Sequence, residues 1–173
     1  IMTFLKKTIS DNQKIELYKF NGDDFIDLDD GYHNDDAVKV CFLDLETTGL
    51  NKETCKIIEF AGKLTAIDKN NGELIGIIDK YQSFNDPEEN IAPEITRVTG
   101  ITNEDVAGHS LDWEYISNLI NHADIIVAHN ASFDRAFMDR YLPLSKDKVW
   151  VCSVNDINWP QRGFGARGQE ILC

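Results

Sequence analysis

The stretch VKVCFLDLETTGL, residues 38–50, decides the fold. Its first eight residues are a nearly continuous apolar run, which is typical of a strand buried on both faces of a sheet. Asp44 and Glu46 are two residues apart, so on a strand both carboxylates project from the same face. They stand just before a Thr-Thr-Gly turn, at the strand end where open α/β sheets place their ligand sites.

The two neighbouring carboxylates predict a cation site. Ionised acids side by side repel each other and raise one pKa, unless a cation neutralises them. Hard oxygen ligands that face one point select Mg²⁺ or Mn²⁺. The alternative is a pair of solvated acids on an edge strand. It is disfavoured because Asp44 and Glu46 interrupt an apolar run, where uncompensated charge is costly.

Further strands and helices follow the first strand in a regular order. Apolar patterns predict a second and a third strand at residues 56–67 and 73–84, and Asn71-Gly72 between them is a hairpin signal. Two more strands are expected at 124–130 and 149–154. Hairpin strands followed by strands that alternate with helices predict an α/β fold. We expect a mixed five-stranded sheet, three antiparallel strands and then parallel strands, flanked by helices.

Helix signals separate the third strand from the last. Pro93 fits a first helical position and Gly100 the residue past the end. Thr102 with Asp105 forms a weak capping box. Two amphipathic helices are predicted by apolar residues at helical spacing: Trp113, Ile116, Leu119 and Ile120, and then Phe133, Phe137 and Tyr141.

A third carboxylate follows the fourth strand. Asn130 or Ser132 can cap the next helix, and Asp134 falls in its first turn, where the helix dipole favours negative charge. If this strand lies beside the first, Asp134 faces Asp44 and Glu46 and completes much of a two-metal site. The alternative, that Asp134 only stabilises the helix terminus, stays open.

Composition limits the classes of partner. The 173 residues suit one domain, and the formal net charge is -13, the wrong sign for gripping a long duplex through its phosphates. No apolar run is long enough to span a membrane and no signal peptide is recognised, so we expect a cytoplasmic protein with no membrane partner. The four cysteines form no CxxC pair, which predicts reduced thiols and no zinc knuckle.

The chain divides at residue 36. Residues 1–36 are predicted to be an acidic N-terminal extension, with a short strand at 14–20, and residues 37–173 the domain that carries the acids. FIDLDDG, residues 25–31, resembles the haloacid dehalogenase DxD motif. It lacks the buried strand that this motif requires, and it also fails the ligand spacing of an EF-hand.

Four segments together resemble the DEDD 3′-5′ exonucleases. FLDLETTGL (42–50) looks like their first motif and IVAHNASFD (126–134) like their second. IIEFAG (57–62) and PEITRVTGIT (93–102) resemble the second strand and the substrate-side helix. The pattern is most similar to the DEDDh type, including the proofreading subunit of the bacterial replicative polymerase, over about residues 38–173.

This resemblance implies an RNase H-like fold and a metal-dependent exonuclease that releases nucleoside 5′-monophosphates. It implies that Asp44, Glu46 and Asp134 are the catalytic metal ligands for two Mg²⁺ or Mn²⁺ ions, with Asp44 bridging them and Asp134 acting through water. Glu59 would support the site. The positions that match nucleotide contacts are Thr47, Gly49, Leu50, Val98, Thr99, Asn130 and Phe133. For Leu50 and Phe133, plain core packing is the alternative.

One departure from the family concerns its third motif, a His about five residues before a last Asp. No His follows His129. GQEILC, at the end of the chain, resembles the start of the helix before that motif, so we expect a domain truncated at its C-terminus and a weak or inactive enzyme. The alternative function is a non-catalytic exonuclease-like module that binds nucleic-acid ends or a protein partner.

The expected partner is a single-stranded 3′ end, with DNA favoured over RNA. A polymerase or a second copy of the chain are the candidate protein partners. Arg162 and Arg167 form a basic patch beside the expected site. Contact with phosphate and a solvated loop remain equally good interpretations of this patch.

Overall fold

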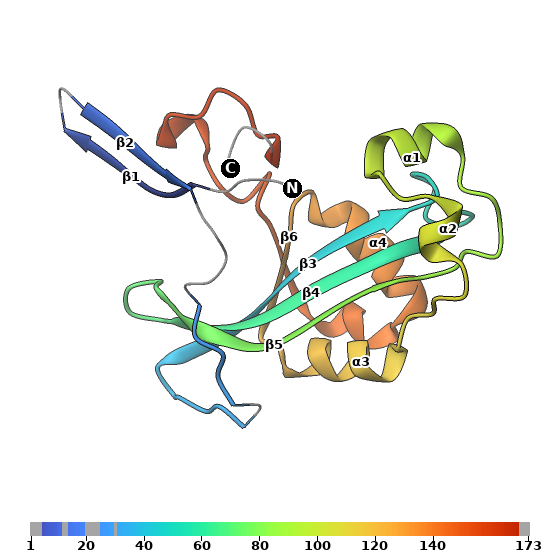
Figure 1. Cartoon of the computed structure of the whole chain (residues 1–173). Helices are drawn as coiled ribbons and strands as arrows, with labels where there is room; N and C mark the ends of the chain where they lie inside the picture. Colours follow the sequence, from blue (N-terminus) through green and yellow to red (C-terminus); the bar gives the residue numbers. More distant parts are fainter. Residues whose placement is uncertain (1–4, 12–13, 20–24, 30, 170–173) are drawn as a thin grey trace.

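A computed structural model describes residues 5–11, 14–19, 25–29 and 31–169. Its centre is a five-stranded sheet of order β5-β4-β3-β6-β7 (Figure 1). The strands are β3 (Ala37–Thr47), β4 (Ile57–Asp68), β5 (Leu74–Phe84), β6 (Ile125–Ala128) and β7 (Val149–Cys152). Strands β3, β4 and β5 pair antiparallel, whereas β6 and β7 run parallel to β3, so the expected mixed sheet is confirmed.

Helices lie between β5 and β6, between β6 and β7, and after β7. They are α1 (Pro93–Thr99), α2 (Asn103–Val106), α3 (Trp113–His122) and α4 (Ala131–Tyr141), with the 3₁₀ helices η1 (Pro143–Asp147) and η2 (Pro160–Arg162). The sequence signals are confirmed. Pro93 begins α1, Gly100 ends it in the left-handed region with φ 79°, and Thr102 and Asp105 form a capping box. The hairpin between β4 and β5 also forms, with Gly72 at φ 74°.

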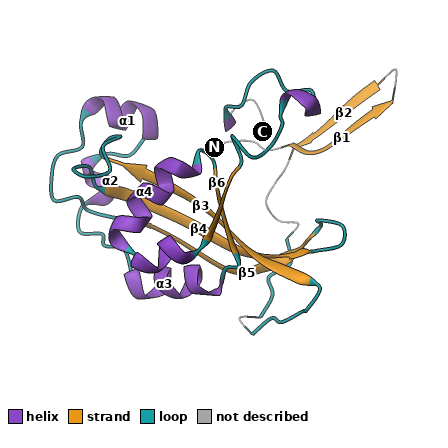
Figure 2. Cartoon of the chain, turned by 180° about the vertical axis from the view of Figure 1, so that it is seen from behind, coloured by secondary structure: helices purple, strands orange, loops and turns teal. Residues whose placement is uncertain are grey.

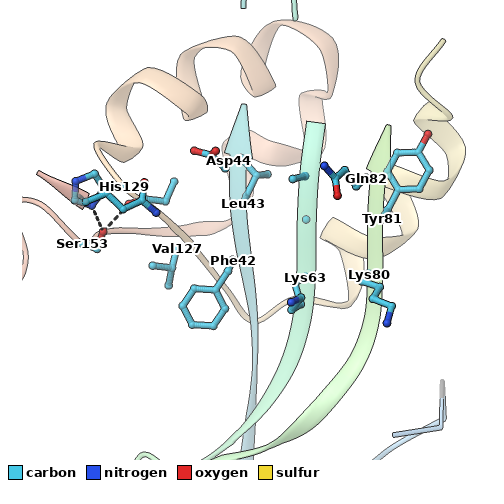
Figure 3. A pocket seen from close by; sticks show the side chains of 14 residues that line it. Phe42, Leu43, Asp44, Lys63, Lys80, Tyr81, Gln82, Val127, His129 and Ser153 are labelled. Atoms are coloured by element: carbon cyan, nitrogen blue, oxygen red, sulfur yellow. Dashed lines mark hydrogen bonds between the residues drawn. The ribbon is translucent and has the colours of Figure 1, made fainter. Parts of the chain in front are cut away.

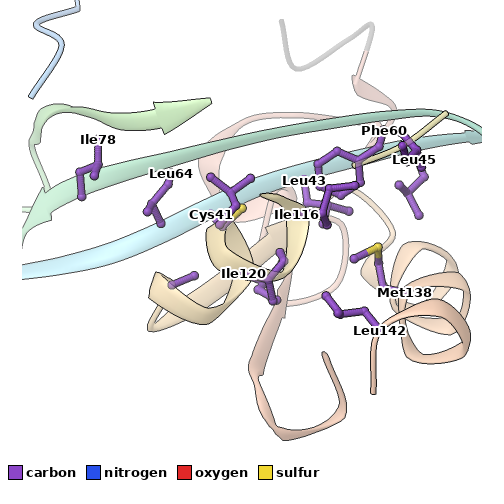
Figure 4. Packing of buried hydrophobic residues seen from close by; sticks show 14 of the residues in the cluster. Cys41, Leu43, Leu45, Phe60, Leu64, Ile78, Ile116, Ile120, Met138 and Leu142 are labelled. Carbon is purple, nitrogen blue, oxygen red and sulfur yellow. The ribbon is translucent and has the colours of Figure 1, made fainter. Parts of the chain in front are cut away.

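The two faces of the sheet differ. Helices α3 and α4 pack on one face, where Cys41, Leu43 and Leu45 of β3 are buried (Figures 2 and 4). The opposite face of β3 is open, so Phe42 is 45% exposed and Asp44 is also exposed. The expectation that this strand is buried on both faces is therefore wrong. Among the described residues the helices cover one face, and an apolar run alone does not distinguish the two cases.

Close packing on the covered face depends on Gly62 in β4. A Cβ atom there would lie 2.8 Å from Leu119 Cδ2 and 2.9 Å from the ring of Phe60. The missing side chain thus lets α3 approach the sheet closely. The core between them includes Phe60, Ile116 and Ile120, all fully buried.

The N-terminal segment contains more structure than the sequence suggested. The expected strand at 14–20 is β2 (Lys14–Lys19), with residue 20 outside the described part, and it pairs with an unexpected β1 (Leu5–Asp11). Residues 26–28 then run along β5: Leu28 N–H donates to Ile77 O (2.7 Å), and Ile77 N–H donates to Ile26 O (2.9 Å). This short segment covers the outer edge of β5.

Two sequence-based predictions concern the C-terminal end and the cysteines. Residues 170–173, which hold most of the expected GQEILC helix, lie outside the described residues. The described cysteines, Cys41, Cys55 and Cys152, are free thiols.

Within the described residues, none of the helices has the length and apolar character needed to cross a bilayer.

Candidate active site

Three carboxylates gather on the open face of the sheet near the end of β3. Asp44 and Glu46 alternate with the buried Leu45, so both project to the open side. The antiparallel register places Glu59 of β4 directly opposite Glu46. Gln82 of β5 donates a hydrogen bond from Nε2 to Glu59 Oε1 (2.7 Å) and so orients that carboxylate.

Asp134 reaches the same strand from α4. Pairing between β3 and β6 ends at Phe42 and Val127, so the backbone of Leu45 lies beyond the parallel ladder. Leu45 N–H donates instead to Asp134 Oδ1 at 3.2 Å. The Asp134 side chain is 2% exposed, and its carboxylate meets the strand between the positions of Asp44 and Glu46. Strand and helix thus bring together the acids that the two sequence motifs supply.

The site is electrostatically unfavourable without a cation. Desolvation raises the pKa of Asp134 to about 7, and the negative charge of Asp44 contributes to the rise. Desolvation also raises the pKa of Asp44, helped by the charge of Glu59. The pKa of Glu46 is raised by desolvation and then by the charges of Asp44 and Glu59. A bound cation would lower all three pKa values.

The donor set fits a hard divalent ion. Carboxylate oxygens are the ligands that Mg²⁺ and Mn²⁺ prefer, and no lysine or arginine of the described chain forms an ion pair with Asp44, Glu46 or Asp134. Within the same residues, however, no three His, Cys, Asp or Glu side chains already stand at metal-binding spacing. Ion binding would therefore require these side chains to turn toward one another.

Beside Asp44 the open face forms a hollow of about 650 Å³ (Figure 3). Phe42 and Lys63 line its floor, and His129 and Ser153 stand at one side (Figure 3). His129 follows β6, and its Nδ1 is 2.9 Å from Ser153 Oγ. The hollow is wide enough for a nucleotide-sized group and ends at a carboxylate.

The turn after β3 has a defined shape. Thr47 Oγ1 donates to Gly49 O (2.7 Å), and a Cβ atom at Gly49 would come within 2.9 Å of Cys55 Sγ. Thr48 Oγ1 donates to Glu89 Oε1 (3.1 Å), which ties the turn to the segment before α1. The turn residues are thus held by contacts on both sides.

Arg140 in the last turn of α4 fixes the continuation of this turn. Its guanidinium donates hydrogen bonds to the carbonyl oxygens of Lys52 and Cys55, the latter at 2.7 Å. The guanidinium also lies 4.4 Å from the centre of the Tyr141 ring, which stacks on Trp113. Helix α4 therefore carries Asp134 at one end and a restraint on the loop of residues 50–55 at the other.

The residues expected to contact nucleotides fall into two groups. Leu50 and Val98 are 86% and 81% exposed, so core packing does not explain them. Phe133 is half-buried, with its ring 5.1 Å from that of Phe137, and it packs partly against the core. Figures 1 and 2 both show α1, which carries Val98, beyond the C-terminal end of β3.

The polar members of this set have mainly local partners. Thr99 Oγ1 donates to Ile95 O within α1 (3.0 Å). Asn130 occupies the N-cap position of α4 in the left-handed region (φ 66°), but its side chain makes no capping hydrogen bond. The expectation that Asn130 or Ser132 caps α4 through its side chain is therefore wrong. Ser132 Oγ donates to Asn130 Oδ1 (3.3 Å) instead.

Sequence reasoning missed three residues of this region. His129 and Ser153 come from different strand ends, and only the parallel pairing of β6 with β7 brings them together. The position of His129 in the second motif was a signal that could have marked it. Arg140 gave no local signal, because its carbonyl partners lie more than eighty residues away in the chain.

Comparisons with known proteins show the family to which the chain is similar. Residues 41–151 match the RNase T family model, described as exonuclease. The chain is 40% identical over 106 residues to DNA polymerase III PolC-type from Staphylococcus aureus. The aligned residues make up 60% of this chain but 7% of the polymerase. The chain thus matches only a small part of that relative.

Solved structures support the fold. Escherichia coli exonuclease I in complex with a dT13 oligonucleotide superposes with a TM-score of 0.54 at 17% identity, over 68% of this chain and 28% of the other. Exonuclease X in complex with 5′ overhanging duplex DNA gives a TM-score of 0.49 at 26% identity, over 77% of this chain and 70% of that one. The first superposition shows a shared exonuclease fold.

Proposed function

This chain belongs to the RNase T exonuclease family of DEDD enzymes, and on that premise we propose that it removes nucleotides from nucleic-acid 3′ ends as 5′-monophosphates. The observation that carries the proposal is the hydrogen bond from Leu45 N–H to Asp134, which holds a buried carboxylate against β3 at the residue that separates Asp44 from Glu46. A structural role at the helix terminus alone would not require a buried acid beside two others.

Asp44, Glu46 and Asp134 would hold two divalent ions, Mg²⁺ or Mn²⁺. Such ions, when bound, supply an activated water and stabilise the leaving 3′ oxygen. Asp44 and Glu46 would hold the ions from β3, and Asp134, whose carboxylate accepts the hydrogen bond from Leu45 N–H, would hold them from α4. Glu59, held by Gln82, would support Glu46 from the neighbouring strand.

The terminal nucleotides would lie across the end of β3. Leu50 and Val98 offer exposed apolar surface for bases, and Phe133 adds a half-buried ring. The backbone of the turn at Thr47 and Gly49 would meet sugar or phosphate, because its shape is fixed by hydrogen bonds and close contacts.

DNA is the favoured substrate. The relative with 40% identity is a DNA polymerase, so we also propose a polymerase as partner and a cytoplasmic location. An acidic protein of net charge -13 suits a substrate held through metal ions at a single-stranded end.

The test uses single-stranded DNA labelled at its 5′ end, with protein in excess and Mn²⁺ present. We expect stepwise shortening from the 3′ end and release of 5′-monophosphates. Asp44→Asn should remove the products, whereas Glu114→Gln, an exposed acid on α3, should leave them unchanged. Shortening from the 5′ end, or full activity in Asp44→Asn, would contradict the proposal.

The alternative is a non-catalytic module that binds nucleic-acid ends. The observation in its favour is that, among the described residues, no three His, Cys, Asp or Glu side chains stand at metal-binding spacing. The same assay separates the two functions, because such a module would bind the labelled DNA and Mn²⁺ and release no nucleotide.

A further inference from the structure

The loop that follows β7 borders the hollow beside Asp44. This C-terminal loop, residues 153–169, begins with Ser153 and ends with Gln169, and both residues line the hollow together with Asp44. Its middle part contains η2 and lies beyond the ends of β6 and β7 (Figure 1). The loop therefore forms a rim next to the proposed catalytic acids.

Polar and aromatic contacts give the rim a defined shape. Ser153 holds the start of the loop: its Oγ is 2.9 Å from His129 Nδ1 (Figure 3). Its carbonyl oxygen accepts a hydrogen bond from Trp159 Nε1 (2.6 Å). The ring of Trp159 meets Phe164 edge-on, with 5.6 Å between ring centroids. Phe164 is nevertheless 37% exposed, so one aromatic surface remains open to solvent.

The rim also differs in charge from the rest of the chain. From Ile157 to Gln169 there is no acidic residue, although the whole chain carries 30 acids against 17 bases. Arg162 and Arg167 are exposed, and within the described residues neither forms an ion pair. By contrast, Arg135 pairs with an acid on its own helix. Two guanidinium groups without an ion pair among the described residues thus stand on either side of an exposed ring in the sequence.

We infer that this loop binds the sugar-phosphate backbone of a single strand whose 3′ end lies at Asp44. Guanidinium groups bind phosphate in a planar, two-pronged geometry, and an exposed ring stacks on bases of any sequence. Two arginine side chains on a protein of strong negative charge suit contact with a short single strand and not with a long duplex. The inference rests on the proposed function, and it assigns the rim to nucleotides upstream of the terminal one.

The experiment measures the affinity of fluorescein-labelled thymidine oligonucleotides by anisotropy, in Ca²⁺, at about 50 and about 200 mM salt. The double variant Arg162→Gln/Arg167→Gln is compared with the unaltered chain and with Lys69→Gln/Lys146→Gln, which removes the same charge at exposed positions elsewhere. Two fewer phosphate contacts should make the affinity for a dodecamer about 7-fold less sensitive to this change of salt. Binding of a dinucleotide should stay unchanged.

The outcomes separate this inference from the proposed function. A control variant that loses as much as the arginine variant, or an arginine variant with the salt dependence of the unaltered chain, would overturn the inference alone. Equal losses for the dinucleotide and the dodecamer would also overturn it, because the rim would then act at the terminal nucleotide. No binding by the unaltered chain would overturn both proposals.

Discussion

The two faces of β3 differ in role: one packs into the hydrophobic core and the other carries the candidate site. On one face Cys41, Leu43 and Leu45 are buried against α3 and α4, and on the other Phe42, Asp44 and Glu46 meet solvent. Successive residues of one strand thus alternate between core and candidate site. An apolar run interrupted by acids can therefore form one face that packs in the core and one face that carries a candidate site. Mutations on the two faces should have separable effects.

The largest expected effect on stability comes from the covered face. Leu43→Ala should lower the free energy of unfolding by about 2–5 kcal/mol, because it leaves a cavity under α3 and α4. Phe42→Ala, one residue away on the open face, should cost about 1 kcal/mol, since its ring is 45% exposed. Urea denaturation of both variants measures the difference. Equal losses would mean that the open face is buried in the folded protein.

The next effect concerns Asp134 and pH. Its carboxyl pKa is raised from 3.8 to about 7 by burial, so the folded state binds the proton more tightly than the unfolded state. Without metal, the stability due to the protonated group is complete below about pH 4 and is lost as pH rises through 7. Asp134→Asn should therefore raise stability at about pH 8, by up to about 4 kcal/mol, and have little effect near pH 4.

Thermal unfolding in EDTA across this pH range provides the measurement. Glu114→Gln on the surface of α3 is the control. Because Glu114 lies in the first turn of this helix, its loss should cost at most about 1 kcal/mol at pH 8 and should not raise stability. A destabilised Asp134→Asn protein at pH 8 would show that the ionised carboxylate is part of the stable fold without any cation.

A smaller effect is expected at Arg140. Replacing it with alanine frees the carbonyl oxygens of Lys52 and Cys55, and the loop after Leu50 loses its restraint. Oligonucleotide affinity should fall about 5-fold, equivalent to about 1 kcal/mol, while Mn²⁺ affinity stays unchanged. Arg140→Lys should restore little, because one ammonium group does not reproduce the fork of the guanidinium. A parallel loss of Mn²⁺ affinity would show that Arg140 supports α4 and the acids as a whole.

Much of the fold could be predicted because its signals are local. The Asn71-Gly72 hairpin, the capping box at Thr102 and the helical spacing of Ile116 and Ile120 each act within a few residues. The burial of β3 on a single face could not be predicted, because it depends on which elements pack against the strand. Strand β1 was missed because its sequence, LKKTISD, lacks a clear alternating apolar pattern.

Part of the candidate site could also be predicted from the sequence, and part depends on contacts that the sequence does not reveal. Asp44 and Glu46 share a face by the period of a strand, which the sequence alone predicts. Their closeness to Asp134 depends on the end of the β3–β6 ladder, and the sequence could only pose it as a condition. Asn130 takes the N-cap position of α4 as expected, but its left-handed backbone at the junction between β6 and α4 leaves its side chain without a capping hydrogen bond.

Asp44, Glu46 and Asp134 together should hold divalent metal at the end of β3. The decisive measurement is titration of Mn²⁺ into the metal-free protein, followed by isothermal calorimetry and electron paramagnetic resonance. We expect saturable binding that is lost or greatly weakened in Asp44→Ala and Asp134→Asn and retained in Glu114→Gln, with tighter binding as pH rises through 7. Mn²⁺ binding of equal strength in all four proteins would contradict it.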